Sequence, residues 1–344
     1  MHHGFELEDE DIRRFNTHEA VEFFRKLLWA EASDADVIQS SAHVPQRIHV
    51  ADGGIDAKVE DANPTREDLI PAGTSGYQIK SSDIAPRECK KEVTNGSGDL
   101  KPRVEKLLDQ DGTYVLVVFE ELVGKASKGG KDKLQTRKEA LMEKFDDLNY
   151  PNADVRVYDT SKLIGIINRF PALVAQEKGL HHVQDYNTWK PRATKQAETF
   201  VADPTRENQI QTIRDAVREP SKSCPVIRVT GLPEVGKTRL VFEALNEDDL
   251  KNRVIHATAR EFDCSGVASQ LQMDPEWSAI IVVDECSSED HKHFTDQFGS
   301  RGDRLTLITI STDQSPVTAD HHIEVKPLDR DATIELLKEN STNA

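Results

Sequence analysis

The sequence has no long apolar run and no secretory leader pattern. Its longest uninterrupted apolar stretch is Tyr114 to Phe119, with Ala279 to Val283 next, and both are far below the ~20 residues that a membrane-spanning helix needs. The first ten residues are acidic and lack the basic-then-apolar order of a signal peptide. The sequence therefore predicts no contact with a membrane.

Cysteine is also scarce. The chain has four cysteines, and none of them forms a pair at metal-ligand spacing. Scattered thiols without pairs are typical of a reducing compartment. We therefore expect reduced cysteines in a cytoplasmic protein.

Positive charge is in deficit. The 344 residues contain 44 Lys and Arg against 61 Asp and Glu, a formal net charge of −17. Since nucleic-acid binding depends mainly on cations meeting phosphates, a chain this acidic should not bind DNA tightly through its overall field. Any DNA contact is expected to be local, metal-assisted or built up by oligomerisation.

Length and composition predict two globular domains. Hydrophobic residues make up 37% and charged residues 31%, and 344 residues suffice for two separate cores. The pattern changes at residues 181–205, which are mixed and polar with two prolines. We therefore predict an N-terminal domain over 1–180, a linker over 181–205 and a C-terminal domain over 206–344.

The C-terminal part contains a phosphate-binding loop. Residues 231–238 read Gly-Leu-Pro-Glu-Val-Gly-Lys-Thr, which fits G-x-x-x-x-G-K-[ST] and follows an apolar stretch that is expected to be a strand. Gly231 and Gly236 let backbone N–H groups turn towards phosphate oxygens. Lys237 is expected to reach the β- and γ-phosphates and Thr238 to bind magnesium. The predicted cofactors are ATP and Mg²⁺.

A second apolar strand ends in two acidic residues. Ile-Ile-Val-Val at 280–283 is followed by Asp284 and Glu285. Asp284 is expected to hold the magnesium ion and Glu285 to orient or deprotonate the attacking water. Strands alternating with helical patterns over 206–344 predict a doubly wound parallel α/β sheet.

These motifs, with Leu-Thr-Leu-Ile-Thr-Ile-Ser-Thr at 305–312 and Ile-Glu-Val-Lys-Pro-Leu at 323–328, resemble the core of STAND ATPases over about residues 205–340. Members of that group oligomerise when they detect a ligand. Two departures stand out. Thr312 and Asp313 occupy the place where many relatives have a phosphate-sensing arginine. The sequence also ends at Ala344, where the resemblance implies that lid, winged-helix and sensor regions follow.

The N-terminal part carries a second set of motifs. Asp-Gly-Gly-Ile-Asp ends at Asp56, and Tyr-Gln-Ile-Lys ends at Lys80. The order resembles the PD-(D/E)xK nuclease core over about residues 12–180, specifically the Mrr-like restriction endonucleases, in which glutamine replaces the second acidic residue. The resemblance implies a restriction-endonuclease-like αβ core, with double-stranded DNA as its substrate.

The chemistry of that site needs oxygen ligands and one cation. Asp56, Gln78 and the Ile79 carbonyl would gather a hard ion such as Mg²⁺. Lys80 lies two residues after Gln78 and so points to the same face of its strand, where it can polarise the attacking water and offset phosphate charge. A carboxylate on the first helix commonly completes the set, and Glu22 is the candidate, because Glu19 is explained by capping Asn16.

Each N-terminal motif also fits an ordinary turn and an ordinary half-exposed strand. Together the two halves resemble the bacterial antiviral STAND effectors of the Avs type. That resemblance implies a homo-oligomer, a tetramer, triggered by a phage protein through a region absent from this chain. The leading hypothesis is a nucleotide-gated DNA endonuclease of phage defence. The alternatives are a signalling ATPase scaffold with an inactive DNA- or protein-binding domain, and a nucleotide-dependent restriction enzyme that moves on DNA.

Overall fold

The structure is a computed structural model that describes residues 6–43, 53–122, 124, 132–180, 182–195, 200–218, 224–273, 276–299, 304–328 and 333. The chain divides into two compact units, Glu6–Asn168 and Arg169–Ala344. In the described residues, no helix is both long enough and apolar enough to cross a bilayer.

The N-terminal unit mixes helices and strands along the chain. Its described elements are α1 (Asp9–Arg13), α2 (Thr17–Asp34), η1 (Gln39–Ser41), β1 (Ala42–His43), β2 (Ala57–Ala62), β3 (Gly73–Lys80), α3 (Pro86–Val93), α4 (Pro102–Leu108), β4 (Thr113–Val118), α5 (Lys133–Asp147), β5 (Val155–Tyr158) and α6 (Thr160–Ile167).

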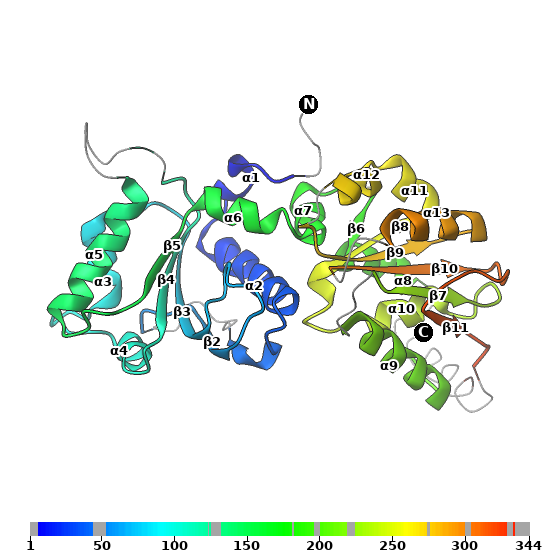
Figure 1. Cartoon of the computed structure of the whole chain (residues 1–344), viewed down its shortest axis with the longest axis horizontal. Helices are drawn as coiled ribbons and strands as arrows, with labels where there is room; N and C mark the ends of the chain where they lie inside the picture. The colour runs from blue at the N-terminus through cyan, green and yellow to red at the C-terminus, as the bar shows by residue number, and fades with distance from the viewer. Residues whose placement is uncertain are drawn as a thin grey trace, which may run out of the picture. The chain divides into compact units, whose positions relative to one another are not determined.

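The described strands of this unit form one sheet in the order β1-β2-β3-β4-β5. β1, β2 and β3 pair antiparallel, whereas β3, β4 and β5 pair parallel. Figure 1 shows α2 on one side of the sheet and α3 and α5 on the other. All six residues of β4 are buried, because helices cover both faces of this central strand.

Local sequence explains where α2 begins and which face it buries. Asn16 accepts hydrogen bonds from the backbone of His18 and Glu19, and the Glu19 side chain accepts one from the Asn16 N–H, so the predicted capping box is confirmed. The ring of Phe24 packs 5.4 Å from that of Tyr77 on β3. Helix α2 therefore covers the sheet face on which Tyr77 lies.

The C-terminal unit alternates helices and strands. Its described elements are α7 (Pro171–Lys178), β6 (Gln184–Asp185), α8 (Tyr186–Ala193), α9 (Pro204–Arg218), β7 (Val226–Thr230), α10 (Lys237–Ala244), η2 (Lys251–Arg253), β8 (Val254–Thr258), α11 (Ala259–Cys264), α12 (Val267–Met273), β9 (Ala279–Asp284), α13 (Ser288–Phe298), β10 (Leu305–Ser311) and β11 (His321–Glu324).

Its described strands form a sheet in the order β11-β7-β10-β9-β8-β6. The first five run parallel to one another, and β6 pairs antiparallel with β8 at the edge. In Figure 1, α8, α9 and α10 lie on one face and α11, α12 and α13 on the other. The predicted α/β class with a parallel sheet is confirmed for this unit. Strands β8, β9 and β10 lie on one side of β7 and β11 lies on the other. Ligands bind at the carboxyl ends of the strands where the order of a sheet reverses in this way.

The unit boundary differs from the sequence-based prediction. The division falls after Asn168 rather than at 180, and the segment that was expected to be a linker contains β6 and α8. Trp189 of α8 is fully buried and stacks on His256 of β8, with ring centroids 4.5 Å apart. Residues 184–193 thus belong to the C-terminal sheet and its core.

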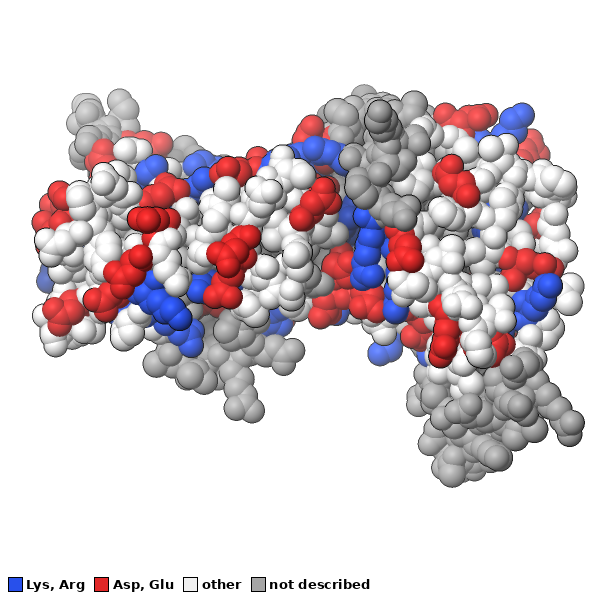
Figure 2. Space-filling view, turned by 60° about the horizontal axis from the view of Figure 1, so that its bottom comes forward, with Lys and Arg blue, Asp and Glu red and all other residues white. Residues whose placement is uncertain are grey.

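Charges of both signs are mixed on the surface. On the face in Figure 2, Lys and Arg side chains lie scattered among Asp and Glu side chains in the described part of the chain. This distribution agrees with the net charge of −17 and favours local rather than long-range contacts with an anionic partner.

Candidate functional site

The phosphate loop follows β7 directly and requires glycine at two positions. A Cβ atom on Gly231 would lie 2.4 Å from the carbonyl oxygen of Val325, so a larger residue does not fit there. Gly236 has a φ of 89° and precedes the first turn of α10, a left-handed conformation that glycine adopts at little cost. Glu234 is also left-handed, with a φ of 64°. The loop backbone is therefore held in a conformation that ordinary residues avoid.

Lys237 lies inside the loop. Its side chain is buried, and its Nζ donates hydrogen bonds to the carbonyl oxygens of Gly231 (3.0 Å) and Leu232 (2.7 Å). Burial lowers the pKa of Lys237, and nearby Asp284 opposes that shift. The ammonium group therefore sits in a poorly solvated position where a phosphate is a better partner than two neutral carbonyls.

Thr238 and Asp284 meet across the sheet. The Thr238 hydroxyl donates to Oδ2 of Asp284 at 2.7 Å, joining the start of α10 to the end of β9. β10 lies between β7 and β9, so two sequence motifs about fifty residues apart converge at the same carboxyl edge of the sheet. A hydroxyl beside a carboxylate is an oxygen-ligand pair suited to Mg²⁺.

Asp284 is held in its charged form. Burial by itself raises the pKa of a carboxyl group, but contact with His256 and hydrogen bonds from the Thr238 hydroxyl and the Glu285 N–H outweigh it and lower the pKa of Asp284. The Nε2 of His256 lies 4.0 Å from Asp284 Oδ2. His256 is fully buried and was missed by the sequence analysis, because a lone histidine in a strand carries no pattern.

Glu285 has a strained backbone and an exposed side chain. Its φ is 53°, a left-handed conformation that residues other than glycine seldom adopt and that clusters at functional sites. Its side chain is 73% exposed, and one oxygen lies 3.9 Å from Nη2 of Arg192. The structure thus points Glu285 away from the buried position of Asp284 and towards solvent.

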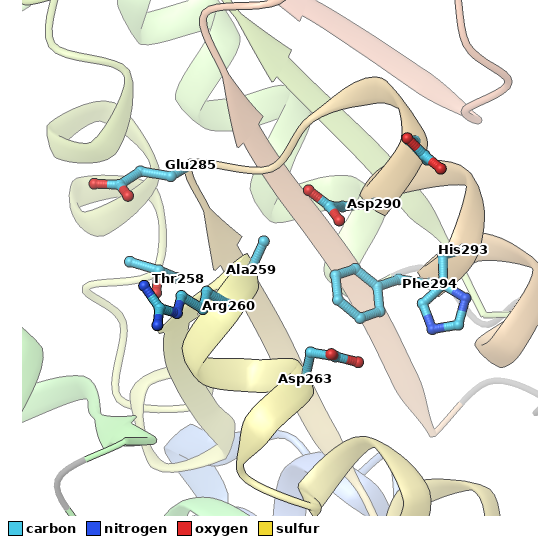
Figure 3. Close-up of a pocket in the computed structure, with 9 residues that line it drawn as sticks. Thr258, Ala259, Arg260, Asp263, Glu285, Asp290, His293 and Phe294 are labelled. Atoms are coloured by element: carbon cyan, nitrogen blue, oxygen red, sulfur yellow. The ribbon is translucent and has the colours of Figure 1, made fainter.

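A pocket opens beside Glu285. It has a volume of about 540 Å³ and lies against α11 and α13. Figure 3 shows Glu285 at the end of β9, with Arg260 and Asp263 on α11 and His293 and Phe294 on α13. No residue of the phosphate loop lines this pocket.

Arg206 is a further residue near the loop that the sequence analysis missed. It comes from α9, is buried, and donates through Nη2 to the carbonyl oxygens of Val235 (2.7 Å) and Lys326 (3.3 Å). Burial lowers its pKa. Arg206 ties the loop to the segment after β11, and no spacing in the sequence connects it with the motif.

Asp56 and Gln78 are in direct contact in the N-terminal unit. Asp56 Oδ2 accepts hydrogen bonds from Nε2 of Gln78 (2.6 Å) and from the Ile79 N–H (2.7 Å). The Asp56 N–H donates to the Tyr77 carbonyl at 2.7 Å, which fixes Asp56 against β3. The carboxylate and the amide therefore lie together at the start of β2.

Lys80 lies on the same face of β3 as Gln78, since side chains alternate along a strand. The parallel register pairs Gln78 with Leu116 and Lys80 with Val118, and both partners belong to the core under α3, α4 and α5. Lys80 Nζ lies 2.8 Å from Oε2 of Glu92 on α3. Asp56, Gln78 and Lys80 thus share one side of the sheet, together with the carboxylate of Glu92.

Glu22 is placed differently from these three residues. It pairs with Arg25 on its own helix at 2.8 Å, and α2 packs against the Tyr77 face, opposite to the face of Gln78 and Lys80. The structure therefore does not group Glu22 with them. Helix α2 reaches β3 at its amino end, where the Thr17 and Ser81 hydroxyls lie 3.2 Å apart.

The Asp56 site fits a divalent cation on one specific observation. Gln78 is 2% exposed, and its Oε1 is buried without a hydrogen-bond partner among the described residues. A buried carbonyl oxygen without a partner costs free energy, which a cation bound beside Asp56 would offset. Among the described residues, no group of three or more His, Cys, Asp or Glu side chains is placed to hold a metal. Mg²⁺ does not require such a group, since it keeps several waters and takes one or two carboxylates.

The chain resembles some known proteins in structure but matches none of the known families in sequence. No protein-family description and no curated protein matches the sequence. Similar solved structures include PCH-2 of C. elegans (17% identity, TM-score 0.34, 44% of this chain and 50% of that one), AMPPCP-bound DnaA of Aquifex aeolicus (15%, 0.32, 43% and 54%) and the ORC1 protein of Aeropyrum pernix in complex with DNA (10%, 0.32, 47% and 54%). The chain spans about half the length of each of these proteins.

Proposed function

We propose that the C-terminal unit binds a nucleoside triphosphate with magnesium and hydrolyses it. The observation that carries this proposal is the 2.7 Å contact of Thr238 with Asp284 beside the buried Lys237. Three groups of the required kinds, a hydroxyl, a carboxylate and an ammonium, converge at the amino end of one helix. That helix end also presents unpaired N–H groups to an anion.

Each residue has a distinct task in this proposal. Lys237 exchanges its two loop carbonyls for phosphate oxygens, and Thr238 and Asp284 supply oxygen ligands on the metal side. Magnesium, when bound, neutralises charge on the phosphates. Glu285 accepts a proton from the attacking water or orients it. Arg192 lies close enough to Glu285 to influence where its carboxylate points.

Binding of a fluorescent ATP analogue to the full chain tests the magnesium part of this proposal. Thr238→Ala is expected to weaken binding in Mg²⁺ on the order of tenfold, since the hydroxyl–ion contact is worth about 1.5 kcal/mol. The matched control is Thr212→Ala, because Thr212 is exposed and its hydroxyl donates to the carbonyl of Asn208 on its own helix. Equal affinities of Thr238→Ala and wild type in Mg²⁺ contradict the proposed site.

Hydrolysis is tested separately from binding. Glu285→Gln is expected to abolish phosphate release while it leaves nucleotide affinity within a few-fold of wild type, because Glu285 lies outside the loop. Undiminished turnover in this variant removes Glu285 from the mechanism and leaves the binding proposal intact.

A second function is supported by the N-terminal unit: metal-dependent cleavage of double-stranded DNA. The observation that favours it is the contact of Asp56 with Gln78, whose Oε1 has no partner among the described residues, on the same face as Lys80. Asp56 and Gln78 would hold the cation, which would supply Lewis-acid stabilisation of phosphate charge. Lys80 would polarise the attacking water and offset the charge that develops on the phosphodiester.

Incubation of the full chain with supercoiled plasmid and Mg²⁺ or Mn²⁺ tests this second function. Asp56→Asn and Lys80→Ala are expected to abolish nicking. Lys90→Ala is the matched control, because Lys90 makes an ion pair of similar length with Glu143 on the surface. Intact plasmid together with a retained gel shift supports a DNA-binding domain without nuclease activity.

The two activities combine in the finer proposal of a nucleotide-gated endonuclease in anti-phage defence. In that proposal ATP binding drives assembly of a tetramer, and clustering of N-terminal units raises their effective concentration on DNA. This suits a chain whose overall charge of −17 opposes DNA binding by one copy. Light scattering with and without Mg-ATP, run beside the plasmid assay, tests it: cutting that neither needs nucleotide nor follows assembly contradicts gating.

A further inference from the structure

Glu92 is the acidic residue that faces the N-terminal site from α3. Its Oε2 lies 2.8 Å from Lys80 Nζ, and the two side chains are 26% and 24% exposed. A carboxylate has two oxygens and about four lone-pair directions. One contact with Lys80 therefore leaves Glu92 able to accept a second partner without breaking the first.

The turn before Asp56 packs closely against the end of α3. A Cβ on Gly54 would lie 3.1 Å from the Glu92 carbonyl oxygen and 2.9 Å from side-chain atoms of Lys101 and Val104. Gly54 also has a φ of 86°. Glycine at this position lets the backbone before Asp56 reach the helix turn that carries Glu92.

The position of Glu92 in its helix is unfavourable by itself. It is the last residue but one of α3 (Pro86–Val93), where the partial negative charge of the helix end disfavours a carboxylate. Lys90 and Lys91 are the residue types that suit this last turn. A residue that breaks a local rule in this way is a candidate for a functional role.

The charges of the side chains at this site also favour a bound cation. Asp56 and Glu92 contribute two negative charges and Lys80 one positive charge, while Gln78 is neutral. The buried Gln78 side chain presents an oxygen without a partner among the described residues beside Asp56. A divalent cation would satisfy both that oxygen and the excess carboxylate charge.

We propose that Glu92 supplies the second carboxylate of a divalent-cation site with Asp56 and Gln78. The inference rests on the proposed nuclease function of this unit. Glu92 remains bonded to Lys80 through one oxygen, so the same residue sets the position of the lysine relative to the metal.

Mn²⁺ binding to the full chain without nucleotide tests this assignment, with all variants made in a Thr238→Ala background to weaken the other metal site. Isothermal titration calorimetry or the electron paramagnetic resonance signal of free Mn²⁺ reports the affinity. Glu92→Gln is expected to weaken binding on the order of tenfold or more, and Asp56→Asn to abolish it. Glu88→Gln is the matched control, since Glu88 pairs with Lys91 at 2.8 Å on the same helix and should bind like the parent.

Variants of Lys80 show whether Glu92 binds the cation or only pairs with Lys80. Lys80→Met is expected to bind Mn²⁺ at least as tightly as the parent, because it removes a cation next to the site. The double variant Lys80→Met/Glu92→Gln removes both charges of the Lys80–Glu92 pair and should still bind weakly. Parental affinity in the double variant overturns the proposal, because the loss in Glu92→Gln would then come from the unpaired lysine.

Two further outcomes are distinct. Parental affinity in Glu92→Gln with loss in Asp56→Asn overturns the role of Glu92 and leaves the proposed nuclease site in place. No Mn²⁺ binding at millimolar concentration in the parent overturns the proposed nuclease site itself, and the role of Glu92 with it. Circular dichroism of each variant confirms that affinities are compared between folded chains.

Discussion

Replacement of Lys237 by methionine separates binding from folding in the phosphate loop. Lys237 is 8% exposed, and its ammonium group donates to two carbonyl oxygens. Those charge-assisted bonds contribute about 1.5–3 kcal/mol each, while desolvation of the ion costs several kcal/mol. Methionine has a similar length and no charge, so both effects disappear together. We therefore expect the free energy of unfolding of Lys237→Met to stay within about 1 kcal/mol of wild type, a shift of roughly 2–4 °C in Tm.

The response to nucleotide should differ sharply between the two proteins. At a concentration a hundred times Kd, a ligand stabilises the folded state by about 2.7 kcal/mol, which corresponds to roughly 5–11 °C for a unit of this size. Thermal unfolding with and without Mg-ATPγS should show that shift for wild type and none for Lys237→Met. A full nucleotide shift in Lys237→Met refutes the reasoning, because the nucleotide would then bind elsewhere. A variant that is unfolded without nucleotide refutes the stability estimate.

Three other predictions test the described packing. Gly231→Ala should lower the free energy of unfolding by about 1–3 kcal/mol, and by more than Gly266→Ala. Both glycines have positive φ, but of the two only Gly231 would place a Cβ 2.4 Å from another atom. Equal losses in urea titrations count against the close approach of Gly231 to Val325. Trp189→Ala should lower the free energy of unfolding by about 3–5 kcal/mol, since Trp189 is buried against His256. A decrease under about 1 kcal/mol in the same titration means that residues 184–193 are not part of the core. A thiol reagent at pH 8 should modify Cys264 quickly and the other three cysteines slowly. Cys264 is exposed, whereas burial raises the pKa of the other three thiols to about 11 or 12. Four thiols that react equally fast contradict this burial.

Strong local patterns predicted much of the C-terminal unit. β7 lies directly before the phosphate loop and β9 covers the apolar run at 280–283, as expected, because each run is followed by glycine or by acidic residues. The convergence of Thr238 on Asp284 also follows from the motif, since it needs only two strand ends at one edge of a parallel sheet. No pattern in the sequence predicts that the Glu285 side chain points to solvent or that Arg192 lies near it.

Residues 184–193 show why the boundary was missed. β6 has two residues, too few for any periodicity, and α8 contains Pro191, which usually interrupts a helix. Their place in the structure is decided by Trp189 packing on His256, a contact between residues far apart in the sequence. Helix α7 similarly belongs with the C-terminal unit, since the Ser278 N–H donates to the carbonyl of Arg169, just before the helix, at 2.7 Å.

The arrangement of side chains around Asp56 was predicted in part for a related reason. Gln78 and Lys80 share a face because strands alternate, and this could be inferred from the sequence. Glu92 could not be found in the same way, since α3 reads Pro-Arg-Glu-Cys-Lys-Lys-Glu-Val and buries only Cys89 and Val93. A mostly charged octapeptide gives no sign of which charge faces the site.

A crystal structure of the full chain with Mn²⁺ and a non-hydrolysable ATP analogue tests the central claim, two metal-dependent phosphate sites in one polypeptide. The account predicts two anomalous manganese peaks per chain. One should lie within coordination distance of Thr238 and near Asp284, and the other next to Asp56 and Gln78. Peaks absent from both places, with nucleotide bound elsewhere, contradict the account.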